Sequence, residues 1–255
     1  MRRSALTAVA LALVLGTAAW ALPASAQVPL APQLSVLKGE RNFLSGYDPV
    51  NVDGTVNVVI EIAAGTTAKF MVNNDTGMIE LEQKNGAPRY VQYLPYPCNY
   101  GNVPRSVLSK KKGGDGDAID ALVLGSAVPT GSVVRGRALG VMQLTDTGEK
   151  DDKLIVVMEG SPFFRMRTLS ELDAKFPGVL SILQTWFTSY KGKDKDGKLF
   201  LSSSGFLGRA EAIKLVGDAV LDYENSVTTE ADKRPLDENW NPYLYRWPGA
   251  KNIGE

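Results

Sequence analysis

The segment Val56-Asn57-Val58-Val59-Ile60-Glu61-Ile62 decides the fold class of this chain, because it is a long β-branched run bounded by turn residues. A run of this kind is typical of a strand. Similar short apolar runs follow at 68–72, 78–81, 121–124, 133–144 and 154–158. No helical pattern separates them, so their spacing predicts a small β-barrel or sandwich.

Helices are expected only in the later part of the chain. Ser170 is placed to cap a short helix over 171–176, and Pro177 to open a second helix. The second helix carries apolar residues at helical spacing on one face, namely Val179, Leu183, Trp186, Phe187 and Tyr190. A third helix is predicted over 209–223, with Ile213, Val216 and Val220 inward. The chain is therefore expected to be α+β and mainly β.

Residues 1–26 have the three parts of a secretory signal peptide. Arg2 and Arg3 make the start positive, an apolar run covers 8–19, and the small-residue pattern ending at Ala26 predicts cleavage after that residue. The apolar run is too short to span a bilayer, so no membrane insertion is expected after cleavage. These features predict an exported protein, periplasmic or secreted, and the alternative is an uncleaved N-terminal anchor.

The rest of the chain predicts one domain, over residues 56–225, with a sizeable core. The preceding segment, 27–55, is rich in Pro, Gly, Asn and Ser, and predicts an irregular N-terminal arm. The last segment, 226–255, is polar and poorly patterned, and predicts an irregular C-terminal tail.

The composition excludes several kinds of active site. The chain has no histidine and one cysteine, Cys98, which rules out Ser-His-Asp and Cys-His nucleophile pairs and histidine or thiolate zinc sites. Lys plus Arg and Asp plus Glu both number 28, so loss of the signal peptide would leave a net charge of about −2. Such a protein lacks the positive field that nucleic-acid binding needs. A hydrolase of this composition must activate water with carboxylates and hard cations.

The densest chemical signal is Asp115-Gly116-Asp117-Ala118-Ile119-Asp120, which follows two glycines. Glycine permits a tight turn in which the three carboxylates converge, and converging anions are costly unless a cation lies among them. On spacing alone, a solvated acidic turn explains the segment as well. A calcium loop is disfavoured, because no glutamate follows at the required position.

A second acidic group follows a predicted strand and comprises Asp146, Asp151 and Asp152, with Lys153 beside them. Alone it reads as a hairpin loop. Two acidic loops at the mouth of one strand-rich core, however, are able to hold several Mg²⁺ ions, which bind phosphate oxygens and lower the pKa of water. Cationic and phenolic side chains elsewhere supply what a phosphate site needs. They are Lys69, Arg89, Tyr96, Tyr100, Tyr190 and Lys191.

From about Val56 to Tyr223 the chain resembles the family I (soluble) inorganic pyrophosphatases. The family signature, Asp-x-Asp-Pro/Glu-x-Asp, is matched by Asp115-Gly116-Asp117-Ala118-Ile119-Asp120. The other matches come in family order with family-like spacings. They are Val59-Ile60-Glu61-Ile62, Ala68-Lys69-Phe70, Tyr96-Pro97-Cys98-Asn99-Tyr100-Gly101, Gly131-Ser132-Val133-Val134-Arg135, Asp146 with Asp151-Asp152-Lys153-Leu154, and Tyr190-Lys191.

The resemblance implies a five-stranded OB-like β-barrel with C-terminal helices packed on it, and hydrolysis of pyrophosphate to two orthophosphates. It implies that Mg²⁺ is ligated by Asp115, Asp120, Asp146 and Asp151, with Glu61 near the ions that arrive with substrate. It assigns Asp117 as the acceptor of a proton from the attacking water. The phosphoryl-binding residues that it implies are Lys69, Arg89, Tyr100, Lys153, Tyr190 and Lys191.

The chain departs from the family pattern at several positions. Ala118 stands where proline or glutamate is usual, and Met71 where a glutamate is common, so one carboxylate is missing. Lys84 to Pro88 looks like an insertion, which makes Arg89 the least secure transfer. Asp152 competes with Asp151 as a ligand, although the Asp-x-Lys spacing favours Asp151.

Two other readings stay open. A degenerate member would bind phosphate or a divalent metal without turnover, and Met71 and the export signal motivate that alternative. An OB-type nucleic-acid binder would need a basic groove with stacking aromatics, which the balanced charge disfavours. Mn²⁺ and Zn²⁺ are not distinguished from Mg²⁺ by the sequence. A homo-oligomer is expected, because prokaryotic relatives often form hexamers.

Overall fold

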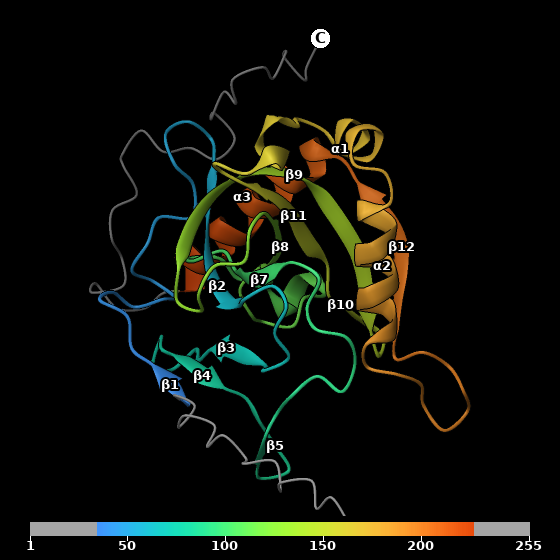
Figure 1. Cartoon of the computed structure of the whole chain (residues 1–255). Coiled ribbons are helices and arrows are strands. Elements are labelled where there is room, and N and C mark those ends of the chain that lie inside the picture. Colours follow the sequence, from blue (N-terminus) through green and yellow to red (C-terminus); the bar gives the residue numbers. More distant parts are fainter. Residues whose placement is uncertain (1–34, 227–255) are drawn as a thin grey trace, which may run out of the picture. The chain divides into compact units, whose positions relative to one another are not determined.

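A closed ring of five strands forms the centre of the domain in the computed structural model, which describes residues 35–226 (Figure 1). The ring comprises β2 (Val56–Ile62), β7 (Asn99–Asn102), β8 (Asp120–Leu124), β11 (Lys153–Met158) and β9 (Val133–Asp146). Each strand pairs with the next in that order, and β9 pairs again with β2. All of these ladders are antiparallel except the β8–β11 ladder. The predicted five-stranded barrel in a mainly β chain is confirmed.

Shorter strands extend this ring. A separate three-stranded sheet has the order β1 (Val36–Leu37), β4 (Ile79–Leu81) and β3 (Phe70–Val72), so a strand lies within the segment predicted as the N-terminal arm. The segment that looked like an insertion is a hairpin of β5 (Gln83–Lys84) and β6 (Ala87–Pro88). Its two turn residues, Asn85 and Gly86, have φ values of 55° and 75°, as a tight two-residue turn requires. Two more strands pair with β9, namely β10 (Glu149–Lys150) and β12 (Leu201–Leu207).

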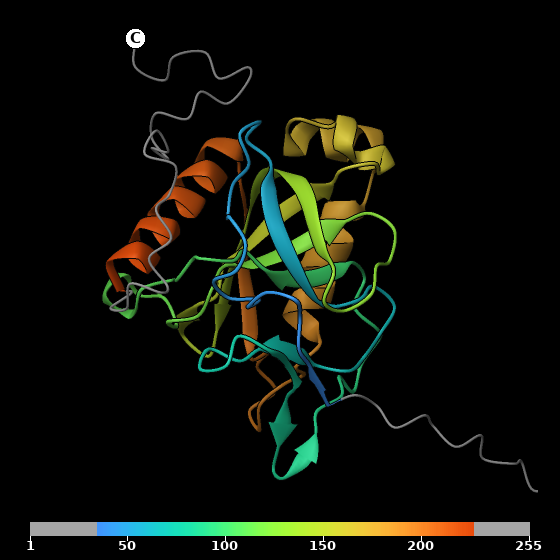
Figure 2. The ribbon, with the colours of Figure 1, turned by 90° about the vertical axis from the view of Figure 1, so that its left-hand side faces the viewer.

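Within residues 35–226, three α-helices follow late in the sequence, as predicted. They are α1 (Leu169–Lys175), α2 (Val179–Ser189) and α3 (Arg209–Ser226), and two 3-10 turns, η1 (Lys110–Lys112) and η2 (Pro162–Arg165), accompany them. The first cap was predicted wrongly: Thr168, not Ser170, accepts the Glu171 backbone N–H at 3.1 Å, because the helix begins before Ser170. Pro177 likewise precedes α2 instead of opening it, and Gly178, at φ 88°, is its N-cap. Figure 2 shows α3 on one side of the barrel, with α1 on another.

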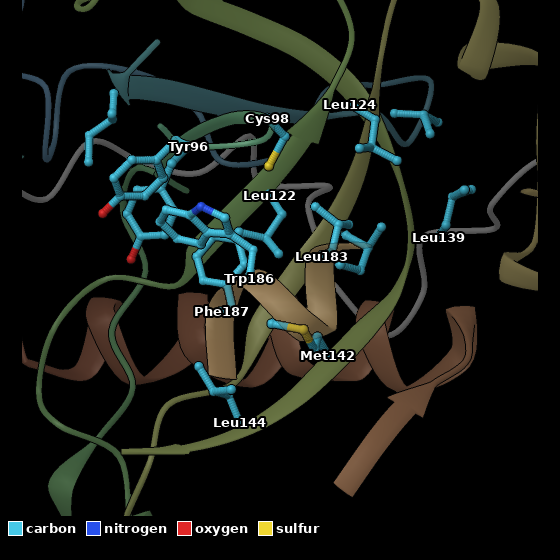
Figure 3. Close-up of a cluster of buried hydrophobic side chains, with 14 of the residues drawn as sticks. Tyr96, Cys98, Leu122, Leu124, Leu139, Met142, Leu144, Leu183, Trp186 and Phe187 are labelled. Carbon is cyan, nitrogen blue, oxygen red and sulfur yellow. The ribbon is translucent and has the colours of Figure 1, made fainter. Parts of the chain in front are cut away.

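The barrel strands divide their side chains between two apolar clusters. Successive residues of a strand point to opposite faces, so Leu122 joins the cluster that includes α2, and Val123 the cluster that includes α3. Figure 3 shows the first cluster, in which Trp186 and Phe187 lie beside Tyr96. The predicted apolar face of α2 therefore anchors that helix, and Asp120, at the start of β8, shares the strand face of Leu122 at the barrel rim.

Two predictions lie outside the described residues. They are the signal peptide over 1–26 and nearly all of the C-terminal tail over 226–255. Between residues 35 and 226, no helix combines the length and the apolar character that a membrane crossing demands.

Candidate active site

Glycines shape the acidic loop that precedes β8. Gly113 and Gly116 have φ values of 84° and 92°, in the left-handed region. Gly114 has no room for a side chain, because a Cβ there would lie 2.5 Å from the Leu108 carbonyl oxygen. Asp115 Oδ1 accepts the Asp117 backbone N–H at 2.9 Å, which closes the turn. The loop turns tightly, as the glycines predict, and burial with repulsion from Asp117 and Asp120 raises the pKa of Asp115.

Asp117 lies exposed at the edge of a cavity of about 100 Å³. Its Oδ1 accepts a hydrogen bond at 2.8 Å from the Asn74 side-chain amide, which comes from the turn between β3 and β4. The cavity is lined by five of the predicted site residues, namely Glu61, Lys69, Tyr100, Asp117 and Asp120. The structure thus brings together predicted site residues from 61 to 120, whereas those from 146 to 191 do not line this cavity.

Glu61 points into this cavity from a β-bulge in β2. The register between β2 and β7 shifts between Ile60 and Ile62, and a bulge of this kind re-aims a side chain. Gly101 lets the strands approach, because a Cβ there would lie 1.8 Å from the Val59 carbonyl oxygen. The buried Glu61 carboxylate accepts the Val72 backbone N–H at 2.7 Å. Burial, with repulsion from Asp120, raises its pKa to about 7.

Lys153 lies between two of the predicted metal ligands. Its ammonium Nζ is 2.5 Å from Asp120 Oδ2 and also donates to Asp151. Although burial opposes the charge, the two carboxylates raise the pKa of Lys153. Burial would also raise the pKa of Asp120, but Lys153 and a hydrogen bond from Tyr100 hold it below its ordinary value. Asp151 is less well compensated: burial and repulsion from Asp120 raise its pKa to about 6.

A second cavity, of about 520 Å³, adjoins the other acidic group. Asp146, at the end of β9, forms an ion pair with Lys191 there. Tyr190 stacks on Trp186 at a ring-centroid distance of 4.7 Å, so the helix core holds this phenol in place. Four predicted residues line this cavity, namely Arg89, Asp146, Tyr190 and Lys191. Burial raises the pKa of Tyr190, while Lys153 and Arg89 lower it and Asp151 and Asp146 raise it further, so its hydroxyl lies in the field of the second acidic group.

Glu82 connects the two cavities through their cations. Its carboxylate lies 2.5 Å from Arg89 Nη1 and 3.9 Å from Lys69 Nζ. The Arg89 backbone N–H also donates to the Glu82 carbonyl oxygen at 2.8 Å. The β5–β6 hairpin therefore returns the chain so that Arg89 lies beside Lys69, and the insertion leaves Arg89 among the other site residues.

Asp152 and Asp151 have different surroundings. Asp152 is buried, accepts the Leu144 backbone N–H at 3.1 Å, and lies 3.1 Å from Lys150 Nζ. Those contacts hold Asp152 in the hairpin, whereas Asp151 shares Lys153 with Asp120.

Hard cations fit this set of side chains, because the acidic residues that line the two cavities offer carboxylate oxygens, the ligands that Mg²⁺ prefers. Burial, with repulsion from neighbouring carboxylates, raises the pKa values of Glu61, Asp115 and Asp151, and a cation bound among them would oppose that shift. Between residues 35 and 226, however, no three Asp, Glu or Cys side chains lie close enough together to hold a metal ion without rearrangement. Lys153 pairs with Asp120 and Asp151, and Lys191 pairs with Asp146. Metal binding by these carboxylates would therefore require both ammonium groups to move.

Sequence reasoning missed three polar residues of this site. Asn74 and Glu82 contact predicted site residues, and Asn102 donates to Glu61 Oε1 at 3.0 Å. Asn102 directly follows a matched motif, which is the only signal that pointed toward it. The other two carry no local signal, because their partners come from distant parts of the chain.

The family model for inorganic pyrophosphatase matches residues 58–224. A soluble inorganic pyrophosphatase of Zea mays is 38% identical over 139 residues, which are 53% of this chain and 58% of that protein. This chain therefore covers little more than half the length of that relative. Two solved structures have similar folds. The type I inorganic pyrophosphatase of P. falciparum has a TM-score of 0.67 and 27% identity over 72% of this chain and 64% of its own. The inorganic pyrophosphatase of Helicobacter pylori has a TM-score of 0.58 and 27% identity, and the match covers 70% of this chain and 98% of that protein.

Proposed function

This chain belongs to the inorganic pyrophosphatase family, and on that premise we propose that it hydrolyses inorganic pyrophosphate to two orthophosphates. The observation that carries the proposal is the position of Lys153, between Asp120 and Asp151. Lys153 contacts Asp120, which lines the smaller, carboxylate-lined cavity, and acts electrostatically on Tyr190, which lines the larger cavity with Arg89 and Lys191. Hydrolysis of a phosphoanhydride needs carboxylates that hold cations and orient water, and it also needs cationic side chains that bind the phosphoryl oxygens.

The larger cavity supports recognition of the phosphoryl groups. Arg89 offers a planar fork of N–H donors, Lys191 a mobile point charge, and Tyr190 a hydroxyl donor. Lys69, Tyr100 and Lys153 offer similar groups beside the smaller cavity. Bound pyrophosphate would compete with Asp146 for Lys191 and with Asp151 for Lys153, which would reduce the cost of freeing these carboxylates.

Asp115, Asp120, Asp146 and Asp151 are the residues that would hold Mg²⁺, with Glu61 for ions that accompany substrate. Bound Mg²⁺ neutralises phosphate charge and lowers the pKa of water. Asp117 supports a separate role, because it lines the smaller cavity and forms no ion pair with a lysine or arginine between residues 35 and 226. It would accept the proton of the attacking water. The P–O bond to the leaving phosphate would break as the water oxygen bonds to the other phosphorus, and Asp117 would then return its proton to the departing phosphate or to solvent.

Phosphate release from pyrophosphate tests the proposal directly. Chelator-treated protein should release none, and added Mg²⁺ should restore turnover that saturates with pyrophosphate. Asp117→Asn should lose most of the turnover while still binding Mg²⁺. Absence of release at every Mg²⁺ concentration, with pyrophosphate still bound, would instead support the degenerate member that binds without turnover.

We also propose that the mature protein works outside the cytoplasm and assembles as a homo-oligomer. The sequence pattern of residues 1–26 supports the first statement. Light scattering of the mature protein tests the second, and a mass equal to one chain at micromolar concentration would contradict it.

A further inference from the structure

A third cavity, of about 140 Å³, lies between the acidic loop and α3 and, among residues 35–226, shares no lining residue with the two cavities of the site. Its apolar wall comes from Val107 and Leu108, which precede the loop, and from Leu215 and Ala219 on α3. Leu108 and Leu215 are partly buried at the edge of the apolar cluster that includes α3. An apolar cavity of about 150 Å³ is large enough to hold benzene. This wall therefore has room for a small ring or a short aliphatic chain.

Carboxylates form much of the polar side of this cavity. Asp218 and Asp222 line it from successive turns of α3, and like charges four residues apart on a helix repel each other. Lys112 Nζ lies 2.8 Å from Asp222, on η1 beside the C-terminal end of α3 (Figure 2). The Lys112 side chain is 59% exposed and that of Asp222 is 18% exposed. The lysine thus reaches the carboxylate from solvent, and the ammonium group of a ligand is able to take its place.

The second charged pair at the cavity has the same arrangement. Lys150 Nζ lies 3.1 Å from Asp152, and the two side chains are 57% and 6% exposed. Three carboxylates and two ammonium groups line the cavity, because Lys214, which pairs with Asp218, lies outside the lining. The lining therefore carries an excess of negative charge, which favours a cationic ligand over a neutral or an anionic one.

Backbone hydrogen bonds join the cavity wall to the acidic loop. The Leu108 N–H donates to the Asp117 carbonyl oxygen at 2.7 Å, and the Leu108 carbonyl oxygen accepts the Gly116 N–H at 2.8 Å. The Val107 N–H donates to the Ala219 carbonyl oxygen at 3.0 Å, which ties the same segment to α3. A ligand packed between Leu108 and α3 would therefore hold the acidic loop in its present turn.

We propose that this cavity binds a small organic amine, with its apolar body against Leu108 and Leu215 and its ammonium group at Asp222, and that the bound amine favours Mg²⁺ binding by the acidic loop. The amine site itself is independent of the proposed function, whereas its effect on Mg²⁺ rests on that function. An amine that orders the loop before Mg²⁺ arrives lowers the cost of ordering it. The amine and Mg²⁺ should therefore each raise the affinity for the other by the same factor.

Benzylamine is the probe, because it joins one ring to one ammonium group. An NMR titration of the purified protein should show binding with a millimolar or lower Kd, and the shifted amides should belong to residues 107–114 and 215–222. Benzyl alcohol, which lacks the charge, should bind about tenfold more weakly, and benzoate should not bind. Absence of benzylamine binding at millimolar concentrations, or equal affinity for benzyl alcohol, would overturn the proposal.

Asp222→Asn keeps the shape of the cavity and removes the carboxylate. It should weaken benzylamine binding about tenfold and leave benzyl alcohol binding unchanged. Asp173→Asn, at an exposed position of α1, is the matched control. Equal weakening in the two variants, or none in Asp222→Asn, would overturn the proposal. An affinity that decreases as the protein concentration rises would assign the cavity to a second copy of the chain and overturn it as well.

Ala219→Leu should fill the cavity and abolish the binding of both benzylamine and benzyl alcohol. Unchanged binding in that variant, once it is shown to be folded, would place the probe elsewhere and reject the site. If Ala219→Leu does not fold, the Asp222→Asn comparison decides alone.

Added Mg²⁺ separates this proposal from the proposed function. Benzylamine affinity should rise several-fold with Mg²⁺, and equal affinity with and without Mg²⁺, in protein shown to bind the ion, would overturn the coupling. A protein that binds benzylamine at Asp222, yet neither binds Mg²⁺ nor releases phosphate, would uphold the amine site and reject the proposed function.

Discussion

Asn74 and Asp117 are 43 positions apart, yet the Asn74 side-chain amide donates to Asp117 Oδ1 at 2.8 Å. The turn that carries Asn74 is rigid, because Asn73 Oδ1 accepts the backbone N–H groups of Asp75 and Thr76 at 2.8 and 3.1 Å. Asn74 is therefore a positioning residue for Asp117, the proposed proton acceptor. It extends from the β3–β4 turn of the three-stranded sheet to the acidic loop.

Replacing Asn74 by Ala should lower kcat about tenfold, with a smaller effect on KM, because one hydrogen bond to a charged group contributes about 1.5–3 kcal/mol and this one is exposed. Asn74→Asp should lower it further, since it places a second carboxylate beside Asp117. Steady-state kinetics at saturating Mg²⁺ would measure both. Asp75→Ala, on the same turn, is the control, and an equal loss there would assign the effect to the turn and not to the amide.

Glu82 positions two cations at once, so its removal should affect substrate binding more than turnover. We expect Glu82→Gln to raise KM for pyrophosphate several-fold to about tenfold, because Lys69 and Arg89 lose their common partner. kcat should change less than KM. Glu149→Gln, on the exposed β10, is the charge-matched control. A fall in kcat with unchanged KM would contradict this role.

Glu61 should make the metal-free protein less stable as the pH rises. Its folded-state pKa is raised from 4.5 to about 7, so the folded state binds the proton more tightly than the unfolded chain does. Stability is then greatest below about pH 4.5 for this group and decreases until about pH 7, by up to about 3 kcal/mol. Urea denaturation of chelator-treated protein between pH 5 and 8 would measure it. Glu61→Gln should flatten this dependence, and an unchanged slope in that variant would assign it to other groups.

Lys153→Met should destabilise the metal-free protein at pH 8 by about 3–5 kcal/mol, because it leaves Asp120 and Asp151 buried without their cation. Part of the loss should disappear near pH 5, since Asp151 has a pKa raised to about 6 and becomes neutral there. Mg²⁺ should also restore stability if it binds these carboxylates. Unfolding midpoints at both pH values, with and without Mg²⁺, check the prediction. A loss independent of pH and Mg²⁺ would indicate packing alone.

The exported form should begin at Gln27. N-terminal sequencing or intact mass of the protein recovered from the periplasm or medium would show it. A chain that keeps Met1 and sediments with membranes would support the uncleaved anchor instead.

Several strands were predictable because their composition matches their role. β2, β9 and β11 are rich in Val, Ile and Leu, and burial on the barrel requires such residues. β7 and β12 were missed, because Asn99-Tyr100-Gly101-Asn102 and Leu201-Ser202-Ser203-Ser204-Gly205-Phe206-Leu207 carry no alternating apolar pattern. Their strand form depends on ladders with distant partners, β2 and β8 for the first and β9 for the second.

The sequence by itself determined which chemistry is open to this protein: no histidine, a single cysteine, and two acidic loops whose order identifies the family. Those features are local, so composition and spacing carry them. Only the tertiary structure decided which groups meet. Lys153 lies between Asp120 and Asp151, Glu82 holds Lys69 and Arg89, and Asn102 supports Glu61. Closure of the barrel creates these contacts between distant residues, and no local pattern encodes the partner of a side chain across a strand ladder.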